Sequence, residues 1–243
     1  MPMALRREAR DGRFVRVGHK GAAALAPENT VASIEAALEQ DVDLVEVDVI
    51  DAPDGSLVLA HSHEEIAPRA PTLDDALEFF AARAPTGVGI DLDLKWHGFE
   101  PAVIAALRRH RLVDRALASS FFPRSLRLLR ALEPGLRTGI SYPWDRRALA
   151  EKAALQPLVW GGVLTLRALL PARIRRMTRS ADACSAMIHY SVLSPALVAR
   201  AHQLDLSIFA WTIDDPGLLA RVVDMGVDGV ISNDPRIFDG RGE

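Results

Sequence analysis

Hydrophobic residues recur along this chain at two spacings, which predict two kinds of element. Short runs rich in leucine and β-branched residues predict buried strands, and apolar residues that return every three or four positions predict amphipathic helices. The predicted strands cover residues 14–18, 44–49, 88–94, 116–120, 138–142, 186–190, 207–212 and 229–232, and a shorter strand-like piece covers 57–61. The predicted helices cover residues 72–84, 100–109, 123–132, 146–154, 166–178, 194–204 and 215–225, and an earlier helix begins after Asn29 or Thr30 and ends near Leu38.

The order of these elements predicts an α/β fold. Strands that alternate with helices build a parallel sheet, and eight such units in 243 residues suit a (β/α)₈ TIM barrel, which typically has about 250 residues. The piece at 57–61 follows the second strand after only an Asp54–Gly55 turn, so we expect a small hairpin insertion there. Pro157, Gly161 and Gly162 are expected to interrupt the segment before residue 166. We therefore expect one barrel domain over residues 14–238.

Composition disfavours several classes of protein. The net charge is −3, so no nucleic-acid-binding surface is expected. No apolar run reaches the roughly 18 residues of a membrane span, and the polar N-terminus lacks the apolar core of a signal peptide. Cys184 is the single cysteine, which excludes an intrachain disulfide. These features predict a cytoplasmic protein without an integral membrane segment.

The predicted strand at 44–49 carries two carboxylates on one face. Side chains alternate between faces along a strand, so Glu46 and Asp48 point one way, whereas Val45, Val47 and Val49 point the other way, under a helix. Two neighbouring acids on a buried strand repel each other and lose hydration unless a cation compensates. A divalent metal ion would compensate, and so would a nearby arginine or lysine. The residues alone leave both interpretations open.

Further polar residues fall where predicted strands end. His19, Asp93, Lys95 and Trp211 occupy such positions, and His61 ends the hairpin piece. Functional groups of (β/α)₈ barrels gather at the carboxyl ends of the strands, so we expect these side chains near the paired acids. Trp211 either packs in the core or stacks on a bound ligand. Lys95 could act as a Schiff-base lysine, although the adjacent Asp93 favours its protonated form.

Together these motifs resemble the signature of the glycerophosphodiester phosphodiesterase family. The matching blocks, in chain order, are His19-Lys20-Gly21, Pro27-Glu28-Asn29-Thr30, Glu46-Val47-Asp48, Asp54-Gly55, Val58-Leu59-Ala60-His61, Asp93-Leu94-Lys95, Ser120-Phe121, Trp211-Thr212 and Asp234-Pro235. The resemblance covers most of the chain, and its first five blocks follow one another closely. It implies a barrel enzyme that hydrolyses a small-molecule partner, a glycerophosphodiester, to glycerol 3-phosphate and an alcohol.

The resemblance also implies a metal site. A divalent cation would be held by Glu46, Asp48 and Asp93, and ligation by carboxylates alone favours Mg²⁺ or Ca²⁺. Asp91 shares a strand face with Asp93 and is either a satisfied core acid or the third ligand instead. The position of Asp93 just before Lys95 favours Asp93.

The remaining roles follow from the same resemblance. His19 and His61 would be the acid–base pair, since histidine titrates near neutral pH. The residues leave open which is the acid and which the base, and we favour His61 at the leaving group. Lys20 would bind the phosphate, and Lys95 and Trp211 would complete the substrate-binding site.

Several positions depart from the family pattern. Lys20 replaces arginine, Ser62 replaces the aspartate after the second histidine, and Asp93 replaces glutamate. Asp214 stands where asparagine is usual, and Ser232-Asn233 stands where threonine-aspartate is usual. These changes raise the alternative of a relative that binds phosphodiesters without cleaving them. The use of Lys95 in a Schiff-base lyase is a further alternative.

Overall fold

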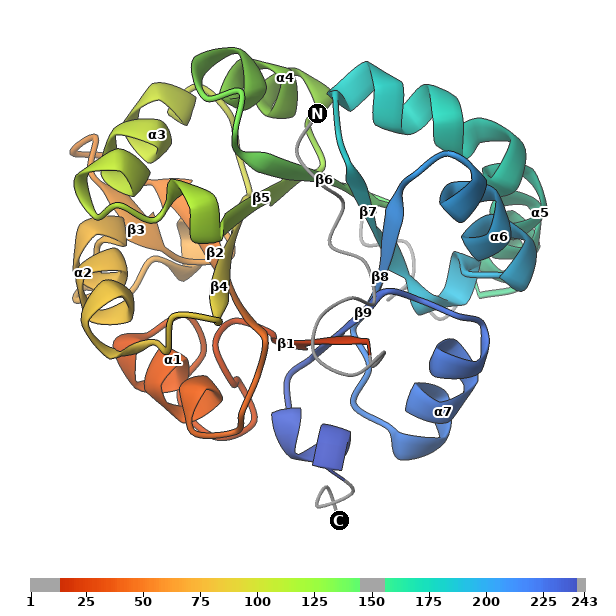
Figure 1. The fold of residues 1–243 in the computed structure, drawn as a ribbon, viewed down its shortest axis with the longest axis horizontal. Coiled ribbons are helices and arrows are strands. Elements are labelled where there is room, and N and C mark those ends of the chain that lie inside the picture. The colour runs from red at the N-terminus through yellow and green to blue at the C-terminus, as the bar shows by residue number, and fades with distance from the viewer. Residues whose placement is uncertain (1–13, 145–155, 240–243) are drawn as a thin grey trace.

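Eight parallel strands close into a barrel that helices surround (Figure 1), which confirms the predicted (β/α)₈ fold. The computed structural model describes residues 14–144 and 156–239. The barrel strands are β1 (Val15–Gly18), β2 (Leu44–Asp51), β4 (Gly89–Leu94), β5 (Ala116–Ser120), β6 (Arg137–Tyr142), β7 (Ser185–His189), β8 (Ser207–Trp211) and β9 (Gly229–Ser232). β1 pairs with both β9 and β2, and this double pairing closes the ring.

The helices follow the strands in alternation. They are α1 (Val31–Leu38), α2 (Leu73–Arg83), α3 (Glu100–Arg109), α4 (Pro123–Leu132), α5 (Gln156–Ala181), α6 (Pro195–Gln203) and α7 (Pro216–Asp224). Side chains that accept hydrogen bonds from the first helical turn mark several helix starts, such as Thr30 before α1 and Thr72 before α2. Of the two cap candidates before α1, the structure therefore selects Thr30.

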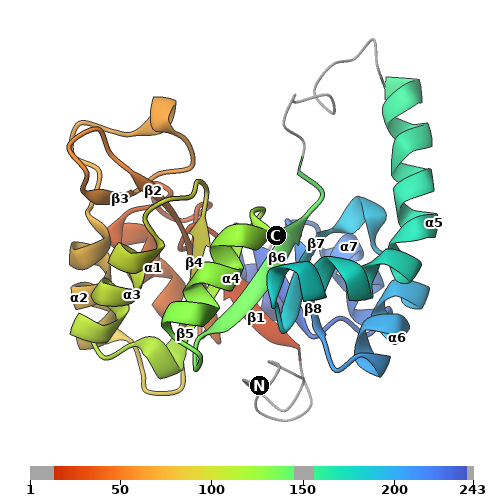
Figure 2. The ribbon, with the colours of Figure 1, turned by 90° about the horizontal axis from the view of Figure 1, so that it is seen from above.

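The predicted hairpin insertion is present beside β2. β3 (Leu57–Leu59) runs antiparallel to the outer end of β2, with Val49 opposite Leu59 and Asp51 opposite Leu57. This pairing extends β2 beyond its predicted end at residue 49. The hairpin rises beyond the carboxyl ends of the barrel strands (Figure 2), so it brings the residues that follow β3 to the end where barrel enzymes place their chemistry.

Apolar side chains of β2 face the helices, as the alternation predicted. Val45, Val47 and Val49 are fully buried in the layer between strands and helices. A second cluster fills the inside of the barrel: Val15, Val17, Leu44, Leu117, Met187, Phe209 and Ile231, with Trp211 packed against it. The interior is therefore a packed core that supports the polar strand ends rather than an open channel.

The segment before residue 166 differs from the prediction. α5 runs continuously from Gln156 to Ala181, so the expected interruption is wrong. Pro157 is the second residue of the helix, where a missing N–H costs nothing. Tertiary packing of the second half, where Leu170 and Ile174 are buried, anchors the helix. The first half of α5 rises beyond the barrel (Figure 2).

The predicted helix at 146–154 lies outside the described residues. Within the described residues, no helix is both long enough and apolar enough to cross a membrane.

Candidate active site

The chain leaves β1 through a tight turn that carries His19. Lys20 and Gly21 have left-handed backbone φ angles of 51° and 81°. A Cβ on Gly21 would lie 2.4 Å from Ser33 Oγ, so glycine is required there. The turn is fixed to β2, because Lys20 N–H donates to Glu46 Oε2 and Gly21 N–H donates to the Glu46 carbonyl, both at 2.8 Å. The His19 ring is thereby held near Glu46, with Nε2 3.8 Å from Oε2.

Three buried carboxylates meet beside this turn. β2 and β4 pair in parallel with Asp48 beside Asp93 and Glu46 beside Asp91. Glu46, Asp48 and Asp93 each contribute one oxygen to a group whose members all lie within 4.8 Å of one another. Asp91 lies one level deeper, where it accepts a hydrogen bond from Ser119 Oγ at 3.1 Å. The structure thus brings together the three predicted metal ligands and places Asp91 next to them as a core acid.

Lys95 lies among the acids. Its Nζ is 2.7 Å from Asp48 Oδ1 and contacts Asp93 Oδ2. Burial opposes the charge of this ammonium group, but Asp48, Asp93 and Glu46 together raise its pKa above the ordinary value. Lys95 is therefore a buried cation that bridges two of the three carboxylates.

Asn29 orients the central carboxylate. Its Nδ2 donates to Asp48 Oδ2 at 2.9 Å, and its Oδ1 accepts from the Asp48 backbone N–H at 2.9 Å. Asn29 is buried and has a φ of 57°, a left-handed conformation that asparagine tolerates better than most residues. The amide thus fixes both the backbone and the side chain of Asp48.

Each of the two predicted catalytic histidines lies next to one of the acids. His61 follows the β3 hairpin, and its Nδ1 is 3.1 Å from Asp48 Oδ2. Because a carboxylate only accepts hydrogen bonds, Nδ1 is the donor in this pair. His19 Nδ1 instead lies 2.7 Å from Asn233 Oδ1, at the end of β9. His61 is about half exposed, whereas His19 is largely buried.

Charge and burial set the protonation of the acids. Burial, reinforced by the neighbouring Asp48, raises the pKa of Glu46 well above its ordinary range. Burial would also raise the pKa of Asp48, but Lys95 and the hydrogen bond from His61 hold it well below the ordinary range. Burial and Asp93 raise the pKa of Asp91. Ionising Glu46 and Asp91 alongside Asp48 is therefore unfavourable unless positive charge beyond that of Lys95 is present.

This donor set fits a divalent cation. Carboxylate oxygens are the ligands that hard cations prefer. Asp93 Oδ1 and Asp91 Oδ1 are buried and, among the described residues, have no hydrogen-bond partner. Unpartnered buried oxygens among acids that ionise only with added positive charge favour a cation. Glu46, Asp48 and Asp93 would hold it, sharing the last two with Lys95.

The predicted substrate-binding residues border the same site. Lys20 Nζ lies 3.0 Å from Glu28 Oε1 and 4.0 Å from Asp48 Oδ2. Trp211 ends β8. Its ring packs edge-on against the rings of Phe121 and His189, with centroid distances of 6.2 Å and 4.9 Å. The lysine therefore lies close to the carboxylates, and the tryptophan belongs partly to the barrel core, as the cluster inside the barrel indicates.

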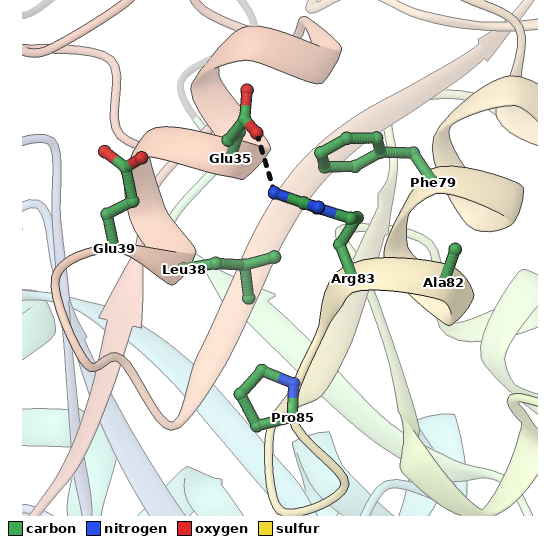
Figure 3. Close-up of a pocket in the computed structure, with 7 residues that line it drawn as sticks. All are labelled: Glu35, Leu38, Glu39, Phe79, Ala82, Arg83 and Pro85. Carbon is green, nitrogen blue, oxygen red and sulfur yellow. Dashed lines mark hydrogen bonds and ion pairs between the residues drawn. The ribbon is translucent and has the colours of Figure 1, made fainter.

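One surface hollow lies apart from these residues. It has a volume of about 260 Å³ and lies between α1 and α2 (Figure 3), where Glu35 and Arg83 form an ion pair at 3.4 Å. Its lining comes from the carboxyl-terminal halves of both helices, which lie near the amino ends of the barrel strands. This hollow is therefore at the opposite end of the barrel from the acids.

Sequence reasoning missed three polar residues around the site. The sequence marks Asn29 as a cap candidate within a matching block, and Asn233 and Asp214 as departures from the family pattern, but indicates no role at the site for any of them. Asp214 accepts from the backbone and side-chain N–H groups of Asn233, at 2.8 Å and 2.7 Å. The sequence did contain a hint of their role: Asp214 and Asn233 come just after strands, and Asn29 lies inside a matching motif.

Comparisons with known proteins agree on one family. The model of the glycerophosphoryl diester phosphodiesterase family matches residues 19–66 and 62–237. A glycerophosphodiester phosphodiesterase of Caldanaerobacter subterraneus subsp. tengcongensis is 25% identical over 261 residues, which cover 90% of this chain and 93% of the relative.

Solved structures share the fold. One from Silicibacter pomeroyi superposes with a TM-score of 0.77 at 21% identity and covers 98% of this chain and 97% of its own. A phosphodiesterase of Oleispira antarctica, solved in complex with the product sn-glycerol-3-phosphate, gives a TM-score of 0.72 at 23% identity, with coverage of 93% and 96%. At these identities the similarity establishes the barrel architecture.

Proposed function

The chain belongs to the glycerophosphoryl diester phosphodiesterase family, and on that basis we propose that it hydrolyses glycerophosphodiesters to glycerol 3-phosphate and an alcohol, with a divalent metal ion. One observation carries the proposal. Asp48 belongs to a carboxylate cluster suited to a cation and also contacts His61, while His19 Nε2 lies 3.8 Å from Glu46 Oε2 in the same cluster. A phosphate bound at the cluster would lie between two imidazoles.

The bound cation would neutralise charge on the phosphate oxygens and orient a nucleophile. The chain supplies the rest of the electrostatics. Lys95 and Lys20 place two ammonium groups within 4.0 Å of Asp48. Because phosphodiesters are anionic, these groups favour binding of the phosphate and counter the repulsion from the acids.

The two histidines divide the proton transfers. Burial lowers the pKa of His19, which favours the neutral ring that can accept a proton from the attacking hydroxyl or water. His61 donates through Nδ1 to Asp48, so the doubly protonated ring is the form that holds a second proton on Nε2 and gives it to the leaving oxygen. Its half-exposed ring can exchange that proton with solvent. His19 thus acts as the base and His61 as the acid.

The geometry disfavours the Schiff-base alternative. An imine forms only from a neutral amine, whereas Lys95 is an ammonium group paired with two carboxylates. Borohydride treatment with a carbonyl compound is therefore expected to leave no adduct on Lys95.

Turnover of defined diesters tests the proposal. Glycerophosphocholine, glycerophosphoethanolamine and glycerophosphoglycerol are incubated with the full chain and Mg²⁺, Ca²⁺ or Mn²⁺, and glycerol 3-phosphate is measured enzymatically. We expect release that EDTA abolishes and that added metal restores. Saturable binding of a diester without release of product, for every metal, would contradict hydrolysis and support the non-catalytic alternative.

A further inference from the structure

A directional chain of hydrogen bonds lies behind His19. His19 Nδ1 faces Asn233 Oδ1 at 2.7 Å, and Asn233 Nδ2 donates to Asp214 Oδ2 at 2.7 Å. The other oxygen of Asp214 accepts from the Asn233 backbone N–H at 2.8 Å and from Ser232 Oγ at 2.9 Å. The chain links the ends of β1 and β9 to the segment that follows β8.

Asp214 fixes the orientation of the asparagine amide. A carboxylate is only an acceptor, so the group that faces it must be the NH₂ of Asn233. Reversing the amide would place two acceptor oxygens 2.7 Å apart, which is repulsive. The amide oxygen must therefore face His19, and it too is only an acceptor. Nδ1 of His19 is consequently the nitrogen that carries the proton.

We infer that Asp214 and Asn233 are positioning residues that hold His19 as its Nδ1–H tautomer, so that Nε2, the nitrogen nearer Glu46, is the proton acceptor. The consequence for turnover rests on the proposed function. The assignment of the tautomer does not, because it follows from the hydrogen bonds alone.

Replacing the Asp214 carboxylate by an amide is expected to reverse the direction of the hydrogen bonds that lead to His19. In Asp214→Asn, the new side-chain oxygen keeps the position that accepts two hydrogen bonds, and its NH₂ then faces Asn233. Asn233 must turn to present its oxygen, which aims its own NH₂ at His19 Nδ1. That nitrogen can accept only if it loses its proton, so the ring changes to the Nε2–H form.

Exchanging the two residues restores the original direction. In the double variant Asp214→Asn with Asn233→Asp, the new carboxylate accepts from His19 Nδ1 and from the amide at 214. The net charge equals that of the wild type. A simple loss of packing in the single variant would not be repaired by a second substitution, so rescue separates positioning from stability.

The experiment combines nitrogen NMR with kinetics on the full chain. Long-range ¹H–¹⁵N spectra of the imidazoles, with His19 assigned by its loss in His19→Gln, report which ring nitrogen is protonated. Asp74→Asn is the matched control, because Asp74 Oδ1 lies 3.0 Å from His110 Nε2 on the outer helices. We expect the control to leave His19 and turnover unchanged.

For the wild type we expect the Nδ1–H form. Asp214→Asn should show the Nε2–H form and a kcat lower by about 100-fold or more, the typical size of an acid–base contribution. The double variant should regain the tautomer and most of the turnover. An Nε2–H form in the wild type, or an unchanged tautomer in Asp214→Asn whatever its activity, would overturn the inference. If no diester is cleaved by the wild type, the proposed function fails, while the spectra still decide the tautomer.

Discussion

Replacement of Lys95 by methionine probes the balance of charge inside the barrel. The ammonium group is buried, lies 2.7 Å from Asp48 Oδ1 and contacts Asp93. Removing one partner of a buried, paired charge costs about 3–5 kcal/mol because the remaining charges stay desolvated. At about 2–4 °C per kcal/mol for a chain of this size, the metal-free variant should unfold about 6–20 °C below the wild type.

Lys20→Met is the matched control within the same site. Its ammonium group lies 3.0 Å from Glu28, a residue whose side chain is about half exposed, and 4.0 Å from Asp48. An ion pair with an exposed partner contributes about 0–1 kcal/mol. We therefore expect a Tm within roughly 4 °C of the wild type.

Scanning calorimetry in EDTA, and then with Mg²⁺ or Mn²⁺, measures both effects. Ligand at about 100 times its Kd adds about 2.7 kcal/mol to the free energy of unfolding. Each metal should raise the Tm of Lys95→Met by more than that of the wild type, since the ion replaces the missing positive charge. Equal losses in the two lysine variants, or a Lys95→Met protein that unfolds at the wild-type temperature, would refute the reasoning.

Three further outcomes follow from the same geometry. Asn29→Ala should lower the free energy of unfolding by about 2–4 kcal/mol, because it leaves buried groups of Asp48 unpaired and places alanine at a positive φ. Asn29→Gly, which adopts a positive φ without strain, should lose less stability. Equal losses of stability in thermal unfolding of the two variants would contradict this. His61→Gln should reduce kcat by about 10²- to 10⁴-fold with a smaller change in KM, whereas His63→Gln, whose ring faces Asp51, should retain wild-type kinetics. Burial raises the pKa of Glu46 above its ordinary value of 4.5, so the protonated acid adds stability at low pH that is lost as pH rises through the raised pKa. Metal binding requires the ionised acid, so the metal-induced rise in Tm should be larger at about pH 8 than at about pH 5 and should lose this dependence in Glu46→Gln.

The sequence predicted those parts of the fold and site that depend on local periodicity. Alternation along 44–49 correctly placed Glu46 and Asp48 on one face and the valines on the other. The eight barrel strands and the hairpin followed from spacing and turns. These features depend on neighbours within a few residues, so a single sequence contains them.

Register and long-range polar contacts were beyond the reach of local patterns. Whether Asp91 or Asp93 joins the acids depends on how β2 and β4 align, and the structure pairs Asp48 with Asp93. The amide of Asn233 meets a histidine 214 positions away, a contact that no local spacing encodes. The length of α5 was likewise not encoded locally: its second half is buried against the barrel, and the helix continues through the exposed Gly161 and Gly162, for which the described residues offer no packing partner.

One diffraction experiment tests the central claim most directly. Crystals soaked with Mn²⁺ and glycerol 3-phosphate, measured at the manganese absorption edge, would locate the ion without ambiguity. The account predicts one anomalous peak bounded by Glu46, Asp48 and Asp93, with the phosphate between His19 and His61. No ion among these carboxylates, or a phosphate bound away from both imidazoles, would contradict it.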